Sequence, residues 1–462
     1  MSQQRILVIA HAHPDHSLGG GELAAYGHFR ELQRQGVQAM FLARSSDPSG
    51  HAGTPFTART ADGSELLFHL PPVDHFRHSQ PERSLIHRNF CDLLERFQPT
   101  AVHFHHYVHL GVELIREVRR WSADIPIVLT LHDYLGICHA QGQMLKTNGI
   151  LCQRATPLDC HHCFREITPP QFFMRELWLK SFFALVDIFV SPSQFLRDRY
   201  VAWGLPAERF LVLENGQQFE AMRSARAQPA AAPAVATKSR RPRPAADSSM
   251  QAGSGAPASA GHGVAQLHTR FLVLGQLSRL KGTPVLIDAV RALAKDVAKA
   301  VRIEIHGTIQ HAPQEFQQRF LADVAELAPT LRYCGPYLPG DVDSIIATAG
   351  WLVVPSIWWE NSPMVIQEAC RNGRPVISSN IGGMAEKVQP GVHGLHFRVG
   401  SAADLARAIT EAASDAERWH QFAKAAPLPP TLHSTVQTLR SLYSTPRGSL
   451  VNALPAFTGL TG

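Results

Sequence analysis

The segment from Trp351 to Cys370 constrains this chain more than any other part of its sequence. Its first six residues, WLVVPS, form an apolar run that is typical of a buried parallel strand ending in a turn. Pro363 favours the first turn of a helix, where its missing N–H costs nothing. We therefore expect Glu360 on the loop after the strand and Glu368 one to two turns into the helix. Ligands of open α/β sheets bind at this carboxyl end of the strands.

The start of that helix is expected to face an anion. The backbone N–H groups around Met364 and Val365 have no acceptor within the helix, so they can point at negative charge. The loop carboxylate of Glu360 can hold sugar hydroxyls, and the helix carboxylate of Glu368 can accept a hydrogen bond from a ribose. We interpret this turn as a site for a sugar attached to a diphosphate.

The spacing of the two carboxylates carries a family resemblance. Residues 360–368 read ENSPMVIQE, two glutamates separated by seven residues. This pattern resembles the nucleotide-binding signature of retaining glycosyltransferases of family 4, also called group 1. The preceding strand-Pro-Ser turn and the later run Gly382-Gly383-Met384-Ala385-Glu386 make the motif specific. The alternative is a surface helix with two unrelated carboxylates.

The resemblance implies an α/β fold of the GT-B type, in which two Rossmann-like doubly wound domains face a cleft. It implies a nucleotide-diphosphate sugar as the donor substrate, without a catalytic metal. The donor would bind mainly to the second domain and the acceptor to the first. The residues expected at the donor are Gly19, Gly20, Arg279, Asn361, Ser362, Met364, Val365 and Glu368, and those expected to be catalytic are His132, Lys281 and Glu360.

A glycine-rich turn follows the first apolar strand, residues 6–10. Gly19-Gly20-Gly21-Glu22 opens a helix, and glycines there let the backbone approach a ligand closely. The third-glycine fingerprint of a dinucleotide site is absent, so the turn does not indicate NAD. The run resembles the Gly-Gly-x-Glu loop of family 4, which faces the donor phosphates across the cleft. A simple tight turn is the alternative.

Histidines follow two of the predicted strands. Residues 125–131 should deliver His132 and Asp133 to the carboxyl-end face of the sheet. The resemblance implies that His132 contacts the reacting sugar, and Asp133 could fix the tautomer of its imidazole. The alternative is a histidine that is merely packed at a strand end. His105 and His106 either touch an acceptor or only line the edge of the sheet.

A second phosphate element follows the strand at 270–275. The sequence GQLSRLKG at 275–282 resembles the donor-phosphate element of the family, and Lys281 matches its cation. Many members have arginine where this chain has Gln276. A glutamine cannot make a bidentate charged contact, so Arg279 or other donors must contribute more.

Four of the seven cysteines lie in one polar loop after His132. Only two of them have the close C-x-x-C spacing. Four thiolates gathered in a cytosolic loop indicate a closed structural zinc site. Reduced thiols or transient disulfides are the alternative, and an iron–sulfur cluster is more remote. The candidate metal ligands are Cys138, Cys152, Cys160 and Cys163, with His139, His161 and His162 as substitutes.

A chain of 462 residues is long enough for two domains of ordinary size. The segment 221–266 is dominated by Ala, Pro, Ser and Gly, which cannot bury a core, so we expect a disordered interdomain linker there. The expected division is an acceptor-side domain over 1–220 that includes the cysteine-rich loop 138–163, the linker, a nucleotide-sugar-binding domain over 267–425, a helix over 426–446 that returns to the N-terminal domain, and a loose tail over 447–462.

The charge and apolar pattern limit the partners of the chain. A net charge of +6 fits an anionic ligand or an anionic membrane surface, but no dense basic block suggests nucleic acid. The first apolar run is too short for a signal peptide, and no run could span a bilayer. The helix expected at 172–186 is aromatic-rich and carries Arg175 and Lys180; core packing is its default role and lipid contact the alternative. We expect a cytoplasmic protein, peripheral at the inner face of the membrane.

These features together predict a retaining glycosyltransferase of the hexosyltransferase type. It would move a sugar from a nucleotide-diphosphate sugar to a glycan or lipid-linked acceptor in cell-surface polysaccharide synthesis. A nucleotide-sugar epimerase of the same fold is one alternative, which product analysis with and without acceptor would separate. A non-catalytic nucleotide-binding scaffold of the same fold is another, and it would require broken site residues.

Overall fold

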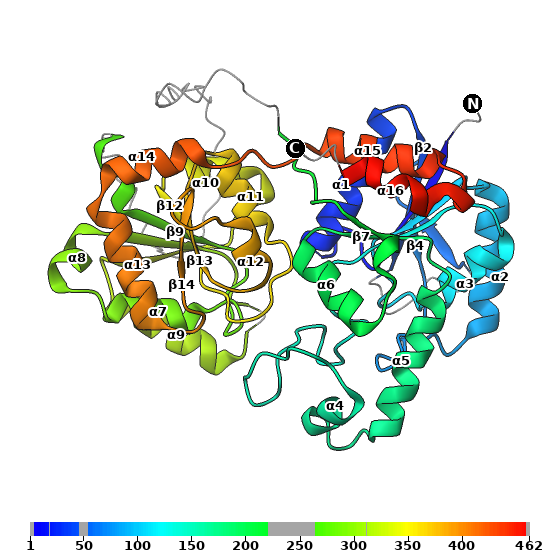
Figure 1. Cartoon of the computed structure of the whole chain (residues 1–462), viewed down its shortest axis with the longest axis horizontal. Helices are drawn as coiled ribbons and strands as arrows, with labels where there is room; N and C mark the ends of the chain where they lie inside the picture. Colours follow the sequence, from blue (N-terminus) through cyan, green and yellow to red (C-terminus); the bar gives the residue numbers. More distant parts are fainter. Residues whose placement is uncertain (1–3, 18, 46–53, 220–263, 311, 459–462) are drawn as a thin grey trace, which may run out of the picture.

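The computed structural model describes residues 4–17, 19–45, 54–219, 264–310 and 312–458. They form two α/β domains that lie side by side, each built on one sheet (Figure 1). Most of the expected linker, residues 221–263, lies outside the described part of the chain. The second domain is entered through the short helix η2 (Val264–Thr269).

The N-terminal sheet has the strand order β3-β4-β2-β1-β5-β6-β7-β8 and is parallel except for β3. The fully buried apolar run of β1 places it at the centre, between β2 and β5. Strands β2 and β4 are added on one side of β1, and β5 to β8 are added on its other side. This reversal of strand order makes the end of β1 a topological switch point. The strands are β1 (Arg5–Ala10), β2 (Gln38–Arg44), β3 (Phe56–Ala58), β4 (Glu65–Phe68), β5 (Ala101–Phe104), β6 (Ile127–Thr130), β7 (Ile188–Ser191) and β8 (Phe210–Val212).

The C-terminal sheet repeats this plan with six parallel strands in the order β11-β10-β9-β12-β13-β14. Its switch point lies between β9 and β12, so the loops after these two strands diverge around one crevice. The strands are β9 (Arg270–Leu274), β10 (Arg302–His306), β11 (Leu331–Gly335), β12 (Trp351–Val354), β13 (Val376–Ser379) and β14 (Gly394–Phe397).

Helices cover both faces of the sheets, and successive side chains of β1 show why. Leu7 and Ile9 join one buried cluster, whereas Ile6 and Val8 join another on the opposite face. The helices are α1 (Gly20–Arg34), α2 (Arg83–Phe97), α3 (Glu113–Trp121), α4 (Pro157–Cys163), α5 (Pro169–Phe183), α6 (Gln194–Trp203), α7 (Thr283–Arg291), α8 (Lys295–Ala300), α9 (Gln314–Glu326), α10 (Val342–Ala347), α11 (Met364–Arg371), α12 (Gly382–Lys387), α13 (Ala402–Ser414) and α14 (Ala416–Ala425), with the short turns η1 (Ala207–Arg209) and η3 (Pro339–Asp341).

The chain crosses back to the N-terminal domain after α14. Helix α15 (Leu432–Ser444) packs beside α1, where Val436 and Leu439 join the core around β1 (Figure 1). The expectation of a loose tail from 447 is wrong for residues 447–458. They form η4 (Arg447–Ser449) and α16 (Leu450–Thr458), because Leu450 and Leu454 are buried against the same core.

Candidate functional site

A cavity of about 370 Å³ lies between the domains, at the carboxyl ends of their central strands. The start of α1 and the loop after β6 line it from one side, and the loops after β9 and β12 line it from the other. Two of the predicted site residues, Gly19 and Arg279, do not line it. Those that do are Gly20, His132, Lys281, Glu360, Asn361, Ser362, Met364, Val365 and Glu368.

The centre of the site is an ion pair between two of the predicted residues. Lys281 Nζ lies 2.6 Å from Glu360 Oε1. The same oxygen accepts hydrogen bonds from Ser356 Oγ at 2.7 Å and from Trp358 Nε1 at 3.0 Å. Glu360 is buried, whereas the Lys281 side chain is 39% exposed toward the cavity side of the pair. The buried Glu360 carboxylate therefore holds the partly exposed Lys281 ammonium group at the wall of the cavity.

The two loops that carry this pair are locked together by a close backbone approach. Gly282 has φ +75°, and a Cβ there would lie 1.8 Å from the carbonyl oxygen of Pro355. Only glycine fits at this point, since any side chain would collide with backbone. The N–H of Ile357 also donates to the carbonyl of Leu280 at 2.9 Å. The loop after β9 is thereby fixed against the loop after β12.

Glu368 lies on α11 at the edge of the cavity, close to Tyr337. Burial raises the pKa of Glu368, Arg371 partly offsets this, and Asp343 adds to it. Burial and the charge of Glu368 raise the pKa of Tyr337 to about 12. Tyr337 therefore keeps its proton at neutral pH and can donate a hydrogen bond beside the Glu368 carboxylate.

The glycine-rich turn approaches the cavity from the N-terminal domain. Gly20 lies directly against Met364 of the C-terminal domain, since a Cβ at Gly20 would lie 3.3 Å from Met364 Sδ. The space at Gly19 is filled by the carboxylate of Glu22, which would lie 2.4 Å from a Cβ there. Gly19 is therefore placed by an internal contact and not by exposure to the cavity, which corrects its expected position in the site.

Glu22 itself is held as a charged group by its neighbours. Its Oε1 lies 3.2 Å from His11 Nε2 and accepts a short hydrogen bond from Ser17 Oγ. Burial alone would raise the pKa of Glu22, but these contacts outweigh it and lower the pKa to about 2. The carboxylate thus pins the turn that precedes α1.

His132 lines the cavity as expected, but its partner differs from the expected one. Its Nε2 lies 3.1 Å from His105 Nδ1, and burial, aided by His106, lowers the pKa of His132 to about 4. Asp133 does not contact this ring: its Oδ2 bonds to His106 Nε2 at 2.8 Å and its Oδ1 accepts from the N–H of Leu135. His132 is therefore a neutral imidazole at pH 7.

The expected help from Arg279 is not seen. Arg279 is exposed outside the cavity, while Gln276 lines it. Of the lining residues that the structure describes, Lys281 is the one with an ammonium or guanidinium group. It is therefore the cation that would meet a bound diphosphate in this arrangement.

Direct hydrogen bonds join the domains next to the site. The carboxylate of Glu386 on α12 accepts from the N–H groups of Gln194 and Phe195, at 2.8 and 2.9 Å. These are the first residues of α6, where the helix dipole favours negative charge. Ser193 Oγ donates to Asn361 Oδ1 at 2.7 Å. Glu386 and Asn361 therefore connect the domains, a role that the sequence motif did not indicate.

The cysteine-rich loop packs directly behind the Glu360 loop. Trp359 Nε1 donates to the carbonyl of Cys152 at 3.1 Å, and Arg199 lies over the Trp359 ring. Burial, with Cys138 and Cys152 nearby, raises the pKa of Cys160 to about 12. Within the described residues, three compact groups of His, Cys and carboxylate ligands occur, and none includes the expected zinc ligands Cys138, Cys152, Cys160 and Cys163.

Several contacts that shape the site were not indicated by the motifs. Ser356 and Trp358 hold Glu360, Tyr337 adjoins Glu368, and Gln367 donates to the carbonyl of Asn215 in the other domain. Their positions shortly after β11 and β12, or within α11, could have indicated a role in the site. Loops at the carboxyl edge of a parallel sheet form its binding sites.

Solved structures define the class of this fold. The structure is similar to that of Anabaena HepE in complex with UDP and glucose, with a TM-score of 0.60, 16% identity and coverage of 96% of this chain and 100% of that one. It is also similar to sucrose-phosphate synthase from Thermosynechococcus elongatus, with a TM-score of 0.62, 17% identity and coverage of 96% and 98%. The two Rossmann-like domains around an interdomain cavity form a GT-B fold.

Family models match both halves of the chain. The model described as "Glycosyltransferase Family 4" matches residues 18–218, and the model described as "Glycosyl transferases group 1" matches residues 261–428. Together they span both domains. The chain belongs to the group 1, family 4 glycosyltransferases.

Curated relatives match one part of the chain. Lipopolysaccharide 1,2-N-acetylglucosaminetransferase of Salmonella typhimurium is 28% identical over 167 residues, which is 35% of this chain and 44% of that protein. A D-inositol 3-phosphate glycosyltransferase of Geodermatophilus obscurus is 32% identical over 154 residues, 32% of this chain and 34% of the relative. The chain thus matches less than half of the length of these relatives.

Proposed function

We propose that this protein is a retaining glycosyltransferase that transfers a sugar from a nucleotide-diphosphate sugar to a glycan or lipid-linked acceptor. The observation that carries the proposal is the Lys281–Glu360 pair at the centre of a cavity lined by both domains. A cation beside the N-terminus of α11 suits a diphosphate, and the carboxylates of Glu360 and Glu368 suit hydroxyls on either side of it.

In this proposal Lys281 neutralises charge on the leaving diphosphate as the glycosidic bond breaks. The lysine is already held by Glu360, so little reorganisation is needed at the moment of reaction. The free N–H groups at the start of α11, around Met364 and Val365, add fixed dipoles on the same side. Glu368 would bind the ribose, with Asn361 and Ser362 in the intervening loop.

On the opposite wall, the backbone of Gly20 would lie near the phosphates and His132 would face the transferred sugar. A neutral imidazole presents either one donor or one acceptor there, so it can orient a hydroxyl without adding charge. The acceptor would enter between this wall and the donor, on the same face of the sugar that the diphosphate leaves. That geometry corresponds to retention on the front face.

A role in cell-surface polysaccharide synthesis is proposed from the relatives. One of them is named for transfer of N-acetylglucosamine to lipopolysaccharide, and HepE was solved with UDP and glucose. Uridine diphosphate sugars are therefore the first donors to test.

The test is a thermal-shift screen against nucleotide sugars, followed by turnover of the best ligand with and without a glycan acceptor. One nucleotide sugar should raise the melting temperature, because a ligand that binds only the folded state stabilises it. Acceptor-dependent release of the nucleoside diphosphate would support transfer. Sugar conversion without any acceptor would identify an epimerase, and a flat screen would reject the proposal.

We also propose that Cys138, Cys152, Cys160 and Cys163 hold a structural zinc ion. Support comes from the place of these free thiols in one loop, where Cys152 is buried and the other three are half-buried, and from their effect on one another's pKa. Zinc would lower those pKa values and gather the sulfurs around one tetrahedral centre. Elemental analysis of freshly purified, reduced protein should give about one zinc per chain. A metal-free sample of full stability would reject this site.

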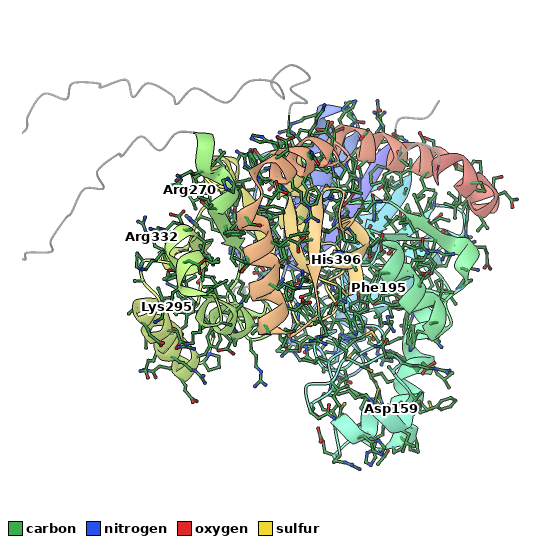
Figure 2. All side chains as sticks on the ribbon, turned by 60° about the vertical axis from the view of Figure 1, so that its left-hand side comes forward. Asp159, Phe195, Arg270, Lys295, Arg332 and His396 are labelled. Atoms are coloured by element: carbon green, nitrogen blue, oxygen red, sulfur yellow. The ribbon has the colours of Figure 1, made fainter. Side chains whose placement is uncertain are left out.

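Peripheral attachment to the inner face of a membrane is a further part of the proposal. In the described residues, no helix has the length and apolarity needed to cross a bilayer. Large exposed apolar side chains instead gather on the lobe of residues 150–177, which projects below the N-terminal domain; Figure 2 labels Asp159 near its tip. They are Ile150, Leu158, Phe173, Met174 and Leu177.

Flotation with anionic lipid vesicles tests this attachment. Replacing Phe173 and Leu177 by serine should reduce the bound fraction severalfold, since each removes exposed apolar area that could enter the interface. The matched control is Leu321→Ser, which changes an exposed leucine on α9 of the other domain. Equal binding by all variants would contradict a membrane role for this lobe.

A further inference from the structure

A chain of hydrogen bonds runs from His132 into the interior of the N-terminal domain. His132 Nε2 lies 3.1 Å from His105 Nδ1, and His105 Nε2 lies 2.9 Å from His28 Nδ1. The far nitrogen of His28 is 3.1 Å from the hydroxyl of Tyr443, a residue of α15. The site histidine is thereby connected to the helix that returns from the C-terminal domain.

The chain continues beyond Tyr443 to the next strand. The Tyr443 hydroxyl lies 2.5 Å from His103 Nδ1, and His103 Nε2 lies 2.7 Å from Thr130 Oγ1. Each of these groups is buried. We name this the histidine relay, and its members in order are Thr130, His103, Tyr443, His28, His105 and His132.

The groups behind His132 are uncharged at neutral pH. Burial lowers the pKa of His28 to about 3 and holds the pKa values of His103 and His105 well below their usual range. Burial also raises the pKa of Tyr443 well above its usual value. A neutral imidazole has one N–H donor and one acceptor nitrogen, so each ring must donate on one side and accept on the other.

His28, His103 and His105 are also close enough together to suggest a metal site. The hydrogen bonds argue against that use. Both ring nitrogens of each of the three residues already have a partner within the relay. The rings of His103 and His105 are stacked, with centroids 4.4 Å apart, which does not aim both at one ion.

We propose that His28, His105 and Tyr443 are positioning residues that fix the tautomer of His132 through this relay. Two arrangements satisfy every bond and also donate the Tyr443 hydrogen within the relay. If the bonds run toward the cavity, His105 donates to His132, whose Nδ1–H is then a donor. If they run the other way, His132 donates to His105 and its Nδ1 is an acceptor. The direction of the hydrogen bonds in the relay therefore decides whether Nδ1 of His132 offers a ligand a donor or an acceptor.

Because the consequence for turnover rests on the proposed function, the decisive readout is spectroscopic. Protein labelled with nitrogen-15 histidine would be compared with the variant Tyr443→Phe, which removes one hydroxyl from the middle of the relay. The variant His132→Gln identifies the two nitrogen signals that belong to His132. In the wild type we expect one protonated and one unprotonated nitrogen. In Tyr443→Phe we expect the two signals to move toward each other as both tautomers become populated.

A second variant guards against loss of the fold. His28→Asn should keep a polar atom near Nδ1 for His105 but lose the bond to Tyr443, and we expect the same change at His132. The matched control is Tyr26→Phe on the same helix α1, which removes a hydroxyl that donates to Glu65 outside the relay. It should leave the His132 signals unchanged.

Turnover separates the two proposals. With an active donor and acceptor, Tyr443→Phe should lower kcat about tenfold with the KM of the donor unchanged, since one hydrogen bond of the relay is lost. An inactive wild type would reject the proposed function and leave the spectroscopic result standing. Unaltered His132 signals in both folded variants would overturn the relay. So would a bound metal that His28→Asn removes and Cys160→Ser retains.

Discussion

At the scale of single residues, the site depends on a cation that is held in place by a buried carboxylate. Glu360 would be costly to bury as a charge without compensation, and Lys281, Ser356 and Trp358 supply it. The same contacts fix the position of the lysine relative to the cavity. A residue pair of this kind both stabilises the loop and prepares it for an anionic ligand.

Replacement of Lys281 by methionine should therefore affect turnover more than folding. We expect kcat to fall by about 10²–10³-fold, the usual effect of losing one fixed electrostatic contact to a developing charge. The melting temperature should fall as well, because Glu360 loses its cation, but the fold should persist because Ser356 and Trp358 still hydrogen-bond the carboxylate. Arg279→Met is the control, since Arg279 lies outside the cavity. Similar losses in both variants would show that Lys281 has no special role.

Glu368→Gln should produce opposite effects on stability and donor binding. Burial raises the pKa of Glu368, so the folded protein binds this proton more tightly than the unfolded chain. This proton contributes fully to the stability of the fold below the pKa that Glu368 has in the unfolded chain. The contribution is lost as the pH rises through the higher pKa that Glu368 has in the folded protein. At pH 7 the glutamine variant should therefore melt no lower than wild type. Calorimetry should show weaker donor binding by roughly 1.5–3 kcal/mol.

The advantage of the glutamine variant should also shrink on acidification, because Glu368 then becomes neutral in both states. Melting curves at several pH values test this directly. A variant that binds the donor as tightly as wild type would remove Glu368 from the site, whatever its stability.

The positions of many site residues could be predicted from the sequence, but the residues to which they hydrogen-bond could not. The order strand, loop and helix around Glu360 followed from an apolar run and a proline, so its place at the cavity was accessible. The pairing of Asp133 with His106, instead of His132, depends on two strands lying side by side. The histidine relay likewise requires α15 to pack beside α1; the return of this helix to the first domain was expected, but its contact with α1 was not.

At the scale of elements, α6 and α12 join the domains. The Glu386 carboxylate caps the first two N–H groups of α6 and carries favourable charge to the positive end of that helix. Asn361 lies in the loop between β12 and α11 and accepts a hydrogen bond from Ser193, beside the same helix start. Any change that separates the domains must break these bonds next to the cavity.

Glu386→Ala should weaken domain closure. The loss of a capping carboxylate costs about 1 kcal/mol, which corresponds to roughly a fivefold shift toward separated domains. Small-angle scattering of the donor-bound protein should show a larger radius of gyration than wild type, and the donor should bind more weakly. The control Glu417→Ala removes an exposed carboxylate from α14 of the same domain. If neither property responds to Glu386→Ala, α6 does not secure closure.

The C-terminal helix α16 makes a prediction about truncation. Leu450 and Leu454 are buried in the N-terminal core, and burial of each leucine contributes about 1.5–3 kcal/mol. Deleting residues 447–462 should therefore lower the free energy of unfolding by at least about 3 kcal/mol in denaturant titrations. Deletion of residues 459–462 alone is the control. Equal stability of both truncated chains would contradict this packing.

Strand positions were the best predicted elements, and the ends of the chain the least. The runs at 6–10 and 270–275 match β1 and β9, because continuous apolar runs are typical of buried parallel strands. Residues 447–458 were expected to be loose. They contain a proline and few charges, and only the contact with the first domain shows that their leucines belong to a core.

At the scale of the whole molecule, two switch points face each other across one cavity. The N-terminal domain presents the start of α1 and His132, and the C-terminal domain presents Lys281 and Glu360. Because α15 and α16 return to the first domain, the N-terminal domain contains chain from both ends of the sequence. The central claim is that a nucleotide-sugar donor binds between these walls.

Hydrogen–deuterium exchange with and without a saturating nucleotide sugar tests that claim most directly. We predict slower exchange in both domains, in the loops after β9 and β12 and also at the start of α1 and after β6. Lys281→Met should lose this protection at the same ligand concentration. Protection confined to one domain, or located away from these loops, would contradict a donor site between the two domains.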